Sequence, residues 1–431
     1  MAGPTGAVAQ RPAAGAGGGS GYGATLSLLA TLFFMWGFIT VINGTLLPHL
    51  RSVFDLNYTQ TTLIESVWFI AYFVASIPSA MLIERIGYKR SIVTGLIVMA
   101  AGAVLMVPAS MIPSYSVVLA ALFIIAAGIT LLQVAANPYV AVIGSPETSS
   151  SRLNLVQAFN SMGTTLAPLF GGYLILGRST SGTAAAGAVL TPAERLADAQ
   201  SVQLPYLIVA AVLVVLAVVI ARFRLPDINA AQRHSRAERR GHSLWRHPNL
   251  VFGIPAIFIY LIAEIGVGNL FINFVSAPEI GNLTHEQASH YLFLLWGGMM
   301  VGRFLGSLLM QRIPAERVLA AFSIGALAVM LVATFATGPV AMWALISVGL
   351  FHSIMFPTIF TLGIRGLGPL TEEGSGLLIM AIAGGALVIV QGWLADAYGL
   401  QTSFLLTAAC ELYVLFYAVY GSRTAPEAAA G

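Results

Sequence analysis

Twelve apolar runs, each near or above the roughly 20 residues that a helix needs to cross a bilayer, occupy most of this chain of 431 residues. Lipid offers the backbone no hydrogen-bond partner, so only helices and closed barrels span it, and these runs lack the alternation of barrel strands. Hydrophobic residues make up 58% of the chain and charged residues 9%, which excludes an ordinary soluble globule. We therefore predict an all-α polytopic membrane protein. The runs lie at residues 24–48, 61–83, 91–110, 114–142, 152–176, 204–222, 250–275, 287–311, 317–336, 339–363, 374–394 and 400–421.

The positively charged side chains indicate how the chain is oriented, because Lys and Arg accumulate in cytoplasmic loops. With the N-terminus inside, 16 of the 20 Lys and Arg residues are cytoplasmic, so we expect both termini in the cytoplasm. The net charge of +3 then reflects topology and gives no support to nucleic-acid binding. A single cysteine, Cys410, excludes an internal disulfide.

The longest charged segment, residues 223–249, separates six runs from six and predicts a basic cytoplasmic linker between two bundles. Binding of anionic lipid is the alternative role for this linker. The bundles are expected to cover residues 24–222 and 250–421. Residues 1–23, rich in Gly and Ala, are expected to be a disordered cytoplasmic tail and not a signal peptide, and residues 422–431 a second tail.

The two bundles also resemble each other in sequence. MLIERIGYKR at 81–90 aligns with LLMQRIPAER at 308–317, so that Arg85 meets Arg312 and Arg90 meets Arg317. Parallel six-plus-six repeats are the plan of the major facilitator superfamily. The first copy resembles the loop between helices 2 and 3 of that superfamily, which implies a charge latch on the cytoplasmic face; a plain positively charged loop is the alternative. The latch residues would be Glu84, Arg85, Gly87, Lys89 and Arg90, with Arg312 and Arg317 in the second copy.

Motifs for covalent chemistry are absent from the sequence. The only lysine, Lys89, follows Tyr88, so no phosphate-binding loop of the GxxxxGK[ST] type exists. HEQASH at 285–290 places its histidines five positions apart, whereas a zinc-binding HExxH places them four apart on one helical face. We therefore predict a transporter and not an enzyme, with no cofactor and no metal.

Polar side chains recur inside several apolar runs, although burying an amide costs free energy unless something hydrogen-bonds it. The fifth run reads RLNLVQAFNSMGTT, and its polar residues recur every three or four positions, which places them on one helical face. The fourth run contains Pro138, which removes one backbone hydrogen bond and can kink the helix. The polar residues are Asn43 in the first run, Gln133 and Asn137 in the fourth, Asn154, Gln157, Asn160, Ser161 and Thr164 in the fifth, and Glu264, Asn269 and Asn273 in the seventh.

Two explanations suit these amides. They can hold helices together, at about 0.6 kcal/mol each on average, or they can bind a ligand in a shared cavity. Amides on four helices exceed what helix packing needs and match a neutral ligand rich in hydroxyl groups, because an amine or a carboxylate would require a compensating charge. The sequence therefore predicts a sugar site. Trp36 and Trp296 can stack on a sugar ring, with core or lipid contact as the alternative for each.

Glu264 is the acidic residue that we single out. A carboxylate at the bilayer midplane costs about 2.5–3.5 kcal/mol on insertion scales, so intramembrane acids are functional candidates. Its predicted role is proton carrier, with sugar acceptor as the alternative. Glu411 is similarly deep, and Arg303 has an acid or a lipid phosphate as its expected partner.

Longer stretches resemble the fucose-galactose-glucose:proton symporter family of the major facilitator superfamily. They are FFMWGFITVINGTLLPHL, AANPYVAVIG, SSSRLNLVQAFNSMG, FPTIFTLGIRGLG and GSGLLIMAIAGGALVIVQGWLADAYG. The resemblance implies a bacterial inner-membrane permease for fucose, glucose, galactose, an N-acetylhexosamine or sucrose. It also implies sugar contacts at Asn43, Gln133, Gln157 and Asn160, and Glu264 matches an acid in helix 7 of the glucose/galactose branch.

Two acids of that family are missing here. Gly44 stands where members have an Asp, and Gln133 stands where the fucose symporter has a Glu. Neither residue can titrate, so uncoupled or sodium-coupled transport is the alternative to proton symport. An exporter or a transporter-like sugar sensor is a more distant alternative. The expected partners are a neutral sugar, a proton or sodium ion and the lipid bilayer, and we expect a monomer.

Overall fold

The computed structural model describes residues 19–45, 58–111, 114–174, 203–225 and 243–424, and all regular structure in these segments is helical. The first half of the chain forms α1 (Gly19–Thr45), α3 (Tyr58–Ile86), α4 (Tyr88–Met111), α5 (Tyr115–Val142), η1 (Pro146–Thr148), α6 (Ser149–Leu174) and α8 (Gln203–Arg222). The second half forms η3 (Leu244–Arg246), α11 (Pro248–Ser276), α12 (His285–Leu309), α13 (Ala315–Phe335), α14 (Gly338–His352), α15 (Met355–Gly363), η4 (Gly368–Leu370), α16 (Thr371–Met380), η5 (Ala381–Leu387), α17 (Val388–Tyr398), α18 (Leu400–Phe416) and η6 (Tyr417–Gly421).

The prediction of twelve membrane-crossing helices is confirmed. Two of the predicted runs are interrupted: one forms α14 and α15, and the other forms α16, η5 and α17. Eleven stretches of the described residues are long and apolar enough to cross a membrane. The remaining helix, α6, carries the polar face noted in the sequence. Helix α1 begins at Gly19, inside the segment expected to be a tail, while residues 1–18 and most of the basic linker lie outside the described residues.

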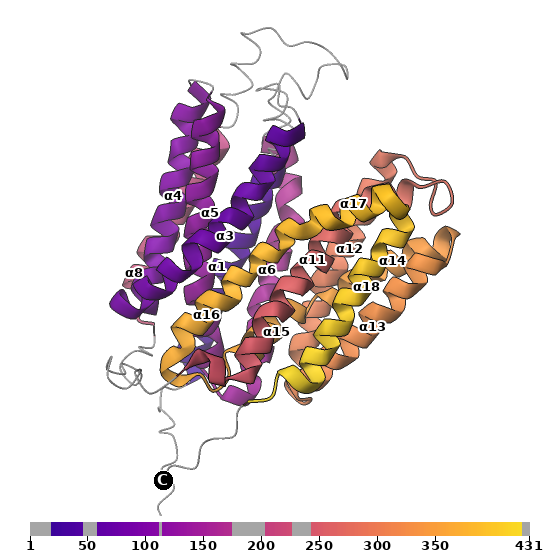
Figure 1. The fold of residues 1–431 in the computed structure, drawn as a ribbon. Coiled ribbons are helices and arrows are strands. Elements are labelled where there is room, and N and C mark those ends of the chain that lie inside the picture. Colours follow the sequence, from indigo (N-terminus) through magenta and orange to yellow (C-terminus); the bar gives the residue numbers. More distant parts are fainter. Residues whose placement is uncertain (1–18, 46–57, 112–113, 175–202, 226–242, 425–431) are drawn as a thin grey trace, which may run out of the picture.

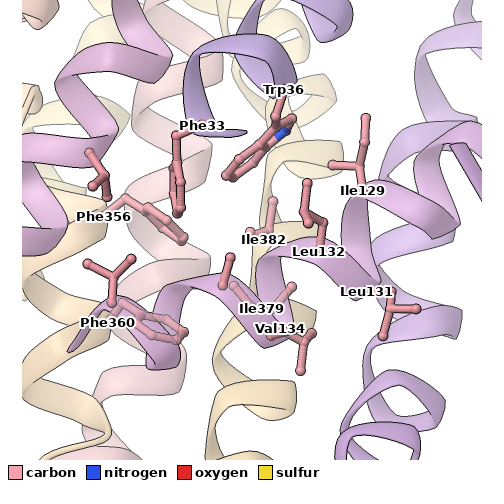
Figure 2. Packing of buried hydrophobic residues seen from close by; sticks show 14 of the residues in the cluster. Phe33, Trp36, Ile129, Leu131, Leu132, Val134, Phe356, Phe360, Ile379 and Ile382 are labelled. Atoms are coloured by element: carbon pink, nitrogen blue, oxygen red, sulfur yellow. The ribbon is translucent and has the colours of Figure 1, made fainter. Parts of the chain in front are cut away.

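The helices of the two halves lie largely on opposite sides of the molecule (Figure 1). Helix α6 joins the sides by packing against α12 and α15, and α16 packs against α3 and α5. Figure 2 shows an apolar cluster between them, in which Phe33 and Trp36 of α1 lie near Phe356 of α15 and Ile382 of η5. Apolar side chains of both halves therefore pack in one cluster.

Several of the described helices contain a proline, and those of the fourth and tenth predicted helices each leave free a carbonyl oxygen that a side chain of another helix bonds. Pro138 of α5 cannot bond the Val134 carbonyl, which accepts a hydrogen bond from Ser375 Oγ of α16 at 3.1 Å. Pro357 of α15 cannot bond the Ser353 carbonyl, which accepts one from Arg303 Nε of α12 at 3.0 Å. The carbonyl next to the second proline break is bonded as well, because Tyr260 donates its hydroxyl to the carbonyl of His352 at 2.9 Å. At both prolines, side chains of other helices thus donate hydrogen bonds to the carbonyls that the helix leaves free.

Hydrogen bonds between the halves gather at the end of the molecule that carries the α3–α4 and α12–α13 turns. We call this the arginine-rich end, since Arg85, Arg90, Arg312 and Arg317 lie on those turns. The bonds join Ser150 to Thr361 Oγ1 at 2.6 Å, Ser151 Oγ to the Ser307 carbonyl at 2.7 Å, Asn154 Nδ2 to Thr358 Oγ1 at 3.1 Å and the Tyr88 hydroxyl to Glu372 at 3.2 Å. The two halves are therefore closed against each other at this end.

A buried histidine and a buried glutamate are hydrogen-bonded within the second half. His352 Nε2 of α14 and Glu411 Oε1 of α18 are 2.8 Å apart, and neither side chain is more than 3% exposed. The other carboxylate oxygen of Glu411 has no hydrogen-bond partner among the described residues. The pair ties α18 to the end of α14, and removing one partner would leave the other buried and unpaired.

Replacing Gly163 by Ala is expected to destabilise the protein. A Cβ at this position of α6 would collide with the Phe34 carbonyl of α1, which is backbone and cannot turn away. Overpacking of this kind costs about 1–3 kcal/mol. Thermal unfolding of the purified variant should show a lower melting temperature. Gly297→Ala is the matched control, because a Cβ there meets nothing within 4 Å; equal melting of the two variants would contradict the close helix contact.

Replacing Glu411 by Ala is expected to lower stability by about 3–5 kcal/mol, because it leaves His352 buried without its partner. Glu411→Gln should cost less, since an amide oxygen can still accept the bond from Nε2. The exposed pair of Glu316 and Arg365, 3.6 Å apart, supplies the control. Glu316→Ala should change the melting temperature little, and an equally small change for Glu411→Ala would argue against a structural pair.

Candidate functional site

A cavity of about 570 Å³ lies between the two halves, beside the closed contact. This volume is within the range of about 300–1,000 Å³ that is usual for small-molecule sites. Two helices of each half contribute: Val41 of α1, Asn160, Ser161, Thr164 and Thr165 of α6, Glu264 of α11, and Ser289, Leu292, Phe293, Trp296, Met299 and Arg303 of α12. The lining combines a mostly apolar wall with a few converging polar groups, the usual composition of a ligand site.

Side chains on the polar face of α6 contribute both to the lining of the cavity and to the closed contact between the halves. Several residues of this face contact the second half, on α12 and α15, while Gln157 and Asn160 bond to α5 and α1 of the first half. Near the arginine-rich end, Asn154 bonds to Thr358 across the halves. Two turns further on, Ser161, Thr164 and Thr165 line the cavity. The predicted polar face therefore exists, and only its later part borders open space.

Arg303 marks the boundary between these two parts. Its side chain is 8% exposed, and its Nε donates a hydrogen bond to the Ser353 carbonyl, which is also in the second half. Nη1 donates to the Gln157 carbonyl at 3.1 Å and to Ser161 Oγ at 2.5 Å, both on α6. One guanidinium thus binds α14 and α6 together where the cavity ends.

The local sequence explains why Arg303 can reach the broken helix. Gly302, the residue before it, lies against α14 so closely that a Cβ would collide with Ser353 Oγ. The absence of a side chain lets α12 approach the break, and Pro357 has left the Ser353 carbonyl free to accept. Gly302 thus allows the close approach, Pro357 leaves the acceptor free, and Arg303 donates the hydrogen bond between α12 and the end of α14.

Glu264 is the acid of the cavity. It is half-buried on α11 and lines the same space as Arg303. The hydrogen bonds of Arg303 among the described residues all go to uncharged oxygen atoms, those of Ser353, Gln157 and Ser161. An acid as the direct partner of Arg303 therefore stays a prediction.

Three predicted sugar ligands are buried within the first half instead of lining this cavity. Gln133 Nε2 donates to the Tyr72 hydroxyl at 2.6 Å, and Gln157 Nε2 donates to Asn137 Oδ1 at 3.4 Å. Asn137 Nδ2 has no hydrogen-bond partner among the described residues. These amides hold α3, α5 and α6 together in this structure, as the packing explanation expects, and their role as sugar ligands stays a prediction.

The remaining predicted ligands fall in different places. Asn160 lines the cavity while its Nδ2 donates to the Phe33 carbonyl of α1 at 2.9 Å, and Trp296 lies on the opposite wall. Trp36 packs against Phe33, with ring centroids 5.2 Å apart (Figure 2). Asn269 and Asn273 of α11 are exposed and are not part of the lining, and the Asn43 side chain lies outside the described residues.

The predicted latch residues lie on the surface of the arginine-rich end. Glu84, Arg85, Arg90, Arg312 and Arg317 are exposed, Lys89 is half-buried, and Gly87 has a φ of 82°, which a glycine adopts without strain. Arg312 borders a second hollow with Glu147 and Arg365. The described hydrogen bonds that join the halves at this end come from Ser, Thr, Asn and Tyr side chains. Of these residues the sequence pattern had indicated Asn154, and the role of the latch residues stays a prediction.

Metal binding has no structural support in the described part of the chain. No group of three or more His, Cys, Asp or Glu side chains is close enough there to hold an ion. Among these residues, the charged side chains of the cavity are Glu264 and Arg303. The site is suited to holding an uncharged polar molecule next to a single acid.

Comparisons with known proteins agree with this architecture. A family model described as Major Facilitator Superfamily matches residues 28–387. The glucose/galactose transporter of Brucella abortus biovar 1 is 46% identical over 404 residues, covering 94% of this chain and 95% of the relative. A crystal structure of the Escherichia coli fucose:proton symporter, FucP, and one of FucP described as a Major Facilitator Superfamily transporter each match at 34% identity. One covers 94% of this chain and all of the other with a TM-score of 0.85, and the second, in the outward conformation, covers 93% and 99% with a TM-score of 0.83. The chain therefore belongs to the major facilitator superfamily and, within it, to the fucose-galactose-glucose:proton symporter family of sugar transporters.

Proposed function

We propose that this multi-pass membrane protein takes up a neutral hexose together with a proton, and that Glu264 carries the proton. The observation that carries the proposal is the cavity between the halves, which holds one acid, one arginine and a row of hydroxyl and amide groups. As a member of its family the chain is a transporter and not an enzyme. Glucose and galactose are the first substrates to test, since the Brucella relative is named for them.

The geometry supports an outward-facing state. The hydrogen bonds between the halves lie at the arginine-rich end, and by the positive-inside rule this end faces the cytoplasm. We propose that residues 24–222 and 250–421 move as two bundles about the cavity, in a bacterial inner membrane with both termini in the cytoplasm. Relatives from bacteria and the match to an outward conformation support this orientation.

Sugar contacts are proposed for the groups that face the cavity. Asn160, Thr164 and Thr165 offer donors and acceptors on α6, and the Trp296 ring offers an apolar face from α12. An aromatic ring against the C–H face of a sugar buries apolar surface while the hydroxyl groups bond at the edges. Gln133, Asn137, Gln157 and Asn43 remain proposed ligands for a state in which the helices close around the sugar. In the described structure Asn137 Nδ2 has no hydrogen-bond partner and could donate to it.

Proton coupling through Glu264 gives the transporter a driving force. A membrane potential contributes about 2.3 kcal/mol per charge per 100 mV, enough for a roughly fiftyfold sugar gradient. Gln133 donates to Tyr72 and cannot titrate, so Glu264 is the acid available among the described cavity residues. We propose a monomer as the transporting unit, because the cavity is formed by one chain.

Replacing Glu264 by Gln is expected to uncouple sugar movement from proton movement. In proteoliposomes that contain the parent protein, glucose or galactose added outside should alkalinise the medium as a proton follows the sugar. Glu264→Gln should abolish this pH change and retain sugar exchange, because the amide keeps the size of the side chain and loses its proton site. Glu316→Gln, the same change on the surface, is the control. Normal accumulation of sugar by Glu264→Gln would refute the assignment, and exchange by the parent without a proton would favour uncoupled or sodium-coupled transport.

Replacing Trp296 by Ala is expected to weaken sugar binding through the lost ring contact. Aromatic contacts contribute about 0.5–1.5 kcal/mol, which corresponds to a roughly 2- to 12-fold increase in Kd or in the KM of exchange. Isothermal titration of glucose and galactose into the purified protein measures the change. Trp393, which is 61% exposed, supplies the matched control, Trp393→Ala. Unchanged affinity for Trp296→Ala would remove this ring from the sugar site.

A further inference from the structure

Aromatic rings and an arginine form a continuous row on the surface where α18 ends, at the arginine-rich end of the molecule (Figure 1). We propose that this row, together with Arg246, binds an anionic phospholipid, with the headgroup on the arginines and an acyl chain along the rings. The inference goes beyond the proposed function, because it does not depend on which sugar the protein moves. It is argued from the packing of the rings, the last turn of the helix and the charges around that turn.

Phe416 is the centre of the row. The centroid of its ring lies 5.6 Å from that of Tyr413, 6.3 Å from that of Tyr420 and 5.5 Å from that of Phe252 of α11. Phe252, Phe416 and Tyr420 are exposed, and they belong to stretches that are long and apolar enough to cross a membrane. Rings exposed in such a stretch face lipid. The row therefore offers an acyl chain a rigid apolar surface.

The end of α18 is wound differently from the rest of the helix. Residues Tyr417–Gly421 form a π turn, in which the Ser422 N–H donates to the Tyr417 carbonyl, five residues back, at 2.8 Å. Such turns are frequent at functional sites. Gly421 allows this turn to lie close to α11, because a Cβ on Gly421 would be only 3.0 Å from the Cβ of Phe252. The turn thus keeps Phe252 against the row.

Arg423 lies at the end of the row, with its guanidinium carbon 5.1 Å from the centre of the Tyr420 ring. The face of a ring attracts a cation through its quadrupole and does not consume the N–H donors. Those donors lie in the plane of the guanidinium, in the fork that matches two phosphate oxygens. Tyr420 therefore holds the arginine in place while its donors remain available to a phosphate.

Arg246 supplies a second positive charge at the same junction. It is exposed at the end of η3, three residues before Asn249. The carbonyl of Asn249 accepts a hydrogen bond from the Tyr417 hydroxyl at 3.0 Å, which fixes the start of α11 against the last turn of α18. Arg246 and Arg423 thus belong to segments that meet where the row of rings ends.

The charges of these two arginines favour lipid as the occupant. Among the described residues no acid is paired with Arg246 or Arg423, whereas Arg365 is paired with Glu316 at 3.6 Å. Each arginine at a membrane surface strengthens the attraction to anionic lipid roughly 5-fold. A two-fold dimer through this face would instead bring the like charges of both copies together.

The test uses photoreactive phosphatidylglycerol, which is anionic, and photoreactive phosphatidylcholine with the same acyl chains. Each lipid is mixed with the full-length protein in detergent micelles, and the labelled peptides are quantified by mass spectrometry after illumination. Phosphatidylglycerol should label residues 413–424 at least 5-fold more than phosphatidylcholine. Arg423→Gln should lower labelling by phosphatidylglycerol roughly 5-fold, because one charge is lost, and should leave labelling by phosphatidylcholine unchanged.

Arg224→Gln is the matched control, since it makes the same change at an exposed arginine just after the end of α8. It should leave the labelling of residues 413–424 as in the parent. Tyr420→Leu should lower labelling by phosphatidylglycerol, because it keeps an apolar side chain but removes the ring that holds the guanidinium.

Equal labelling by the two lipids, or parental labelling by phosphatidylglycerol in Arg423→Gln, would overturn the inference. A dimer in which neither lipid labels residues 413–424 would assign the face to a second copy of the chain and would overturn it as well. Exchange of glucose without a proton would defeat the proposed function and leave the lipid site standing.

Discussion

A proline inside a transmembrane helix leaves one carbonyl oxygen without its helical partner, in surroundings where water cannot replace it. This constraint shapes both halves of the protein. The Val134 carbonyl is bonded by a serine of the opposite half, and the Ser353 carbonyl by Arg303. Each break therefore draws in a side chain from another helix, and in the second half that side chain also reaches the cavity. One of the hydrogen bonds that fix the Arg303 guanidinium therefore depends on a backbone N–H that proline lacks.

Satisfying buried ionisable side chains is the second constraint. A low-dielectric interior tolerates such groups when they have partners, and here Arg303 donates to three oxygen atoms while His352 is hydrogen-bonded to Glu411. Arg303 and Glu264 border the cavity, whereas His352 and Glu411 are buried and connect α14 to α18. Tyr260 packs beside the second pair, with its hydroxyl on the His352 carbonyl and its ring 5.7 Å from the imidazole. The same helix break thus offers acceptors to Arg303 and to Tyr260.

The sequence was sufficient for the fold class, the number of crossing helices and the polar face of α6, because lipid imposes long apolar runs and helical periodicity reveals a face. It also identified Glu264, since a carboxylate in such a run is conspicuous. It did not predict that Gln133 and Gln157 bond to neighbouring helices, because an amide has the same periodicity whether it binds protein or ligand. His352 was missed as the partner of Glu411, since the pairing depends on how α14 and α18 pack. The contacts at the arginine-rich end were missed because serine and threonine carry no distinctive spacing.

The choice of hydroxyl groups for those contacts has a consequence for motion. Thr361 Oγ1 lies within hydrogen-bond distance of the Pro357 and Thr358 carbonyls of its own helix as well as of Ser150, and Asn154 Nδ2 also reaches the Ser150 carbonyl. Each of these two donors therefore keeps an acceptor in its own helix if its contact with the other half is lost. Breaking these two contacts does not leave either donor without a partner, which lowers the free-energy cost of separating the halves at these points.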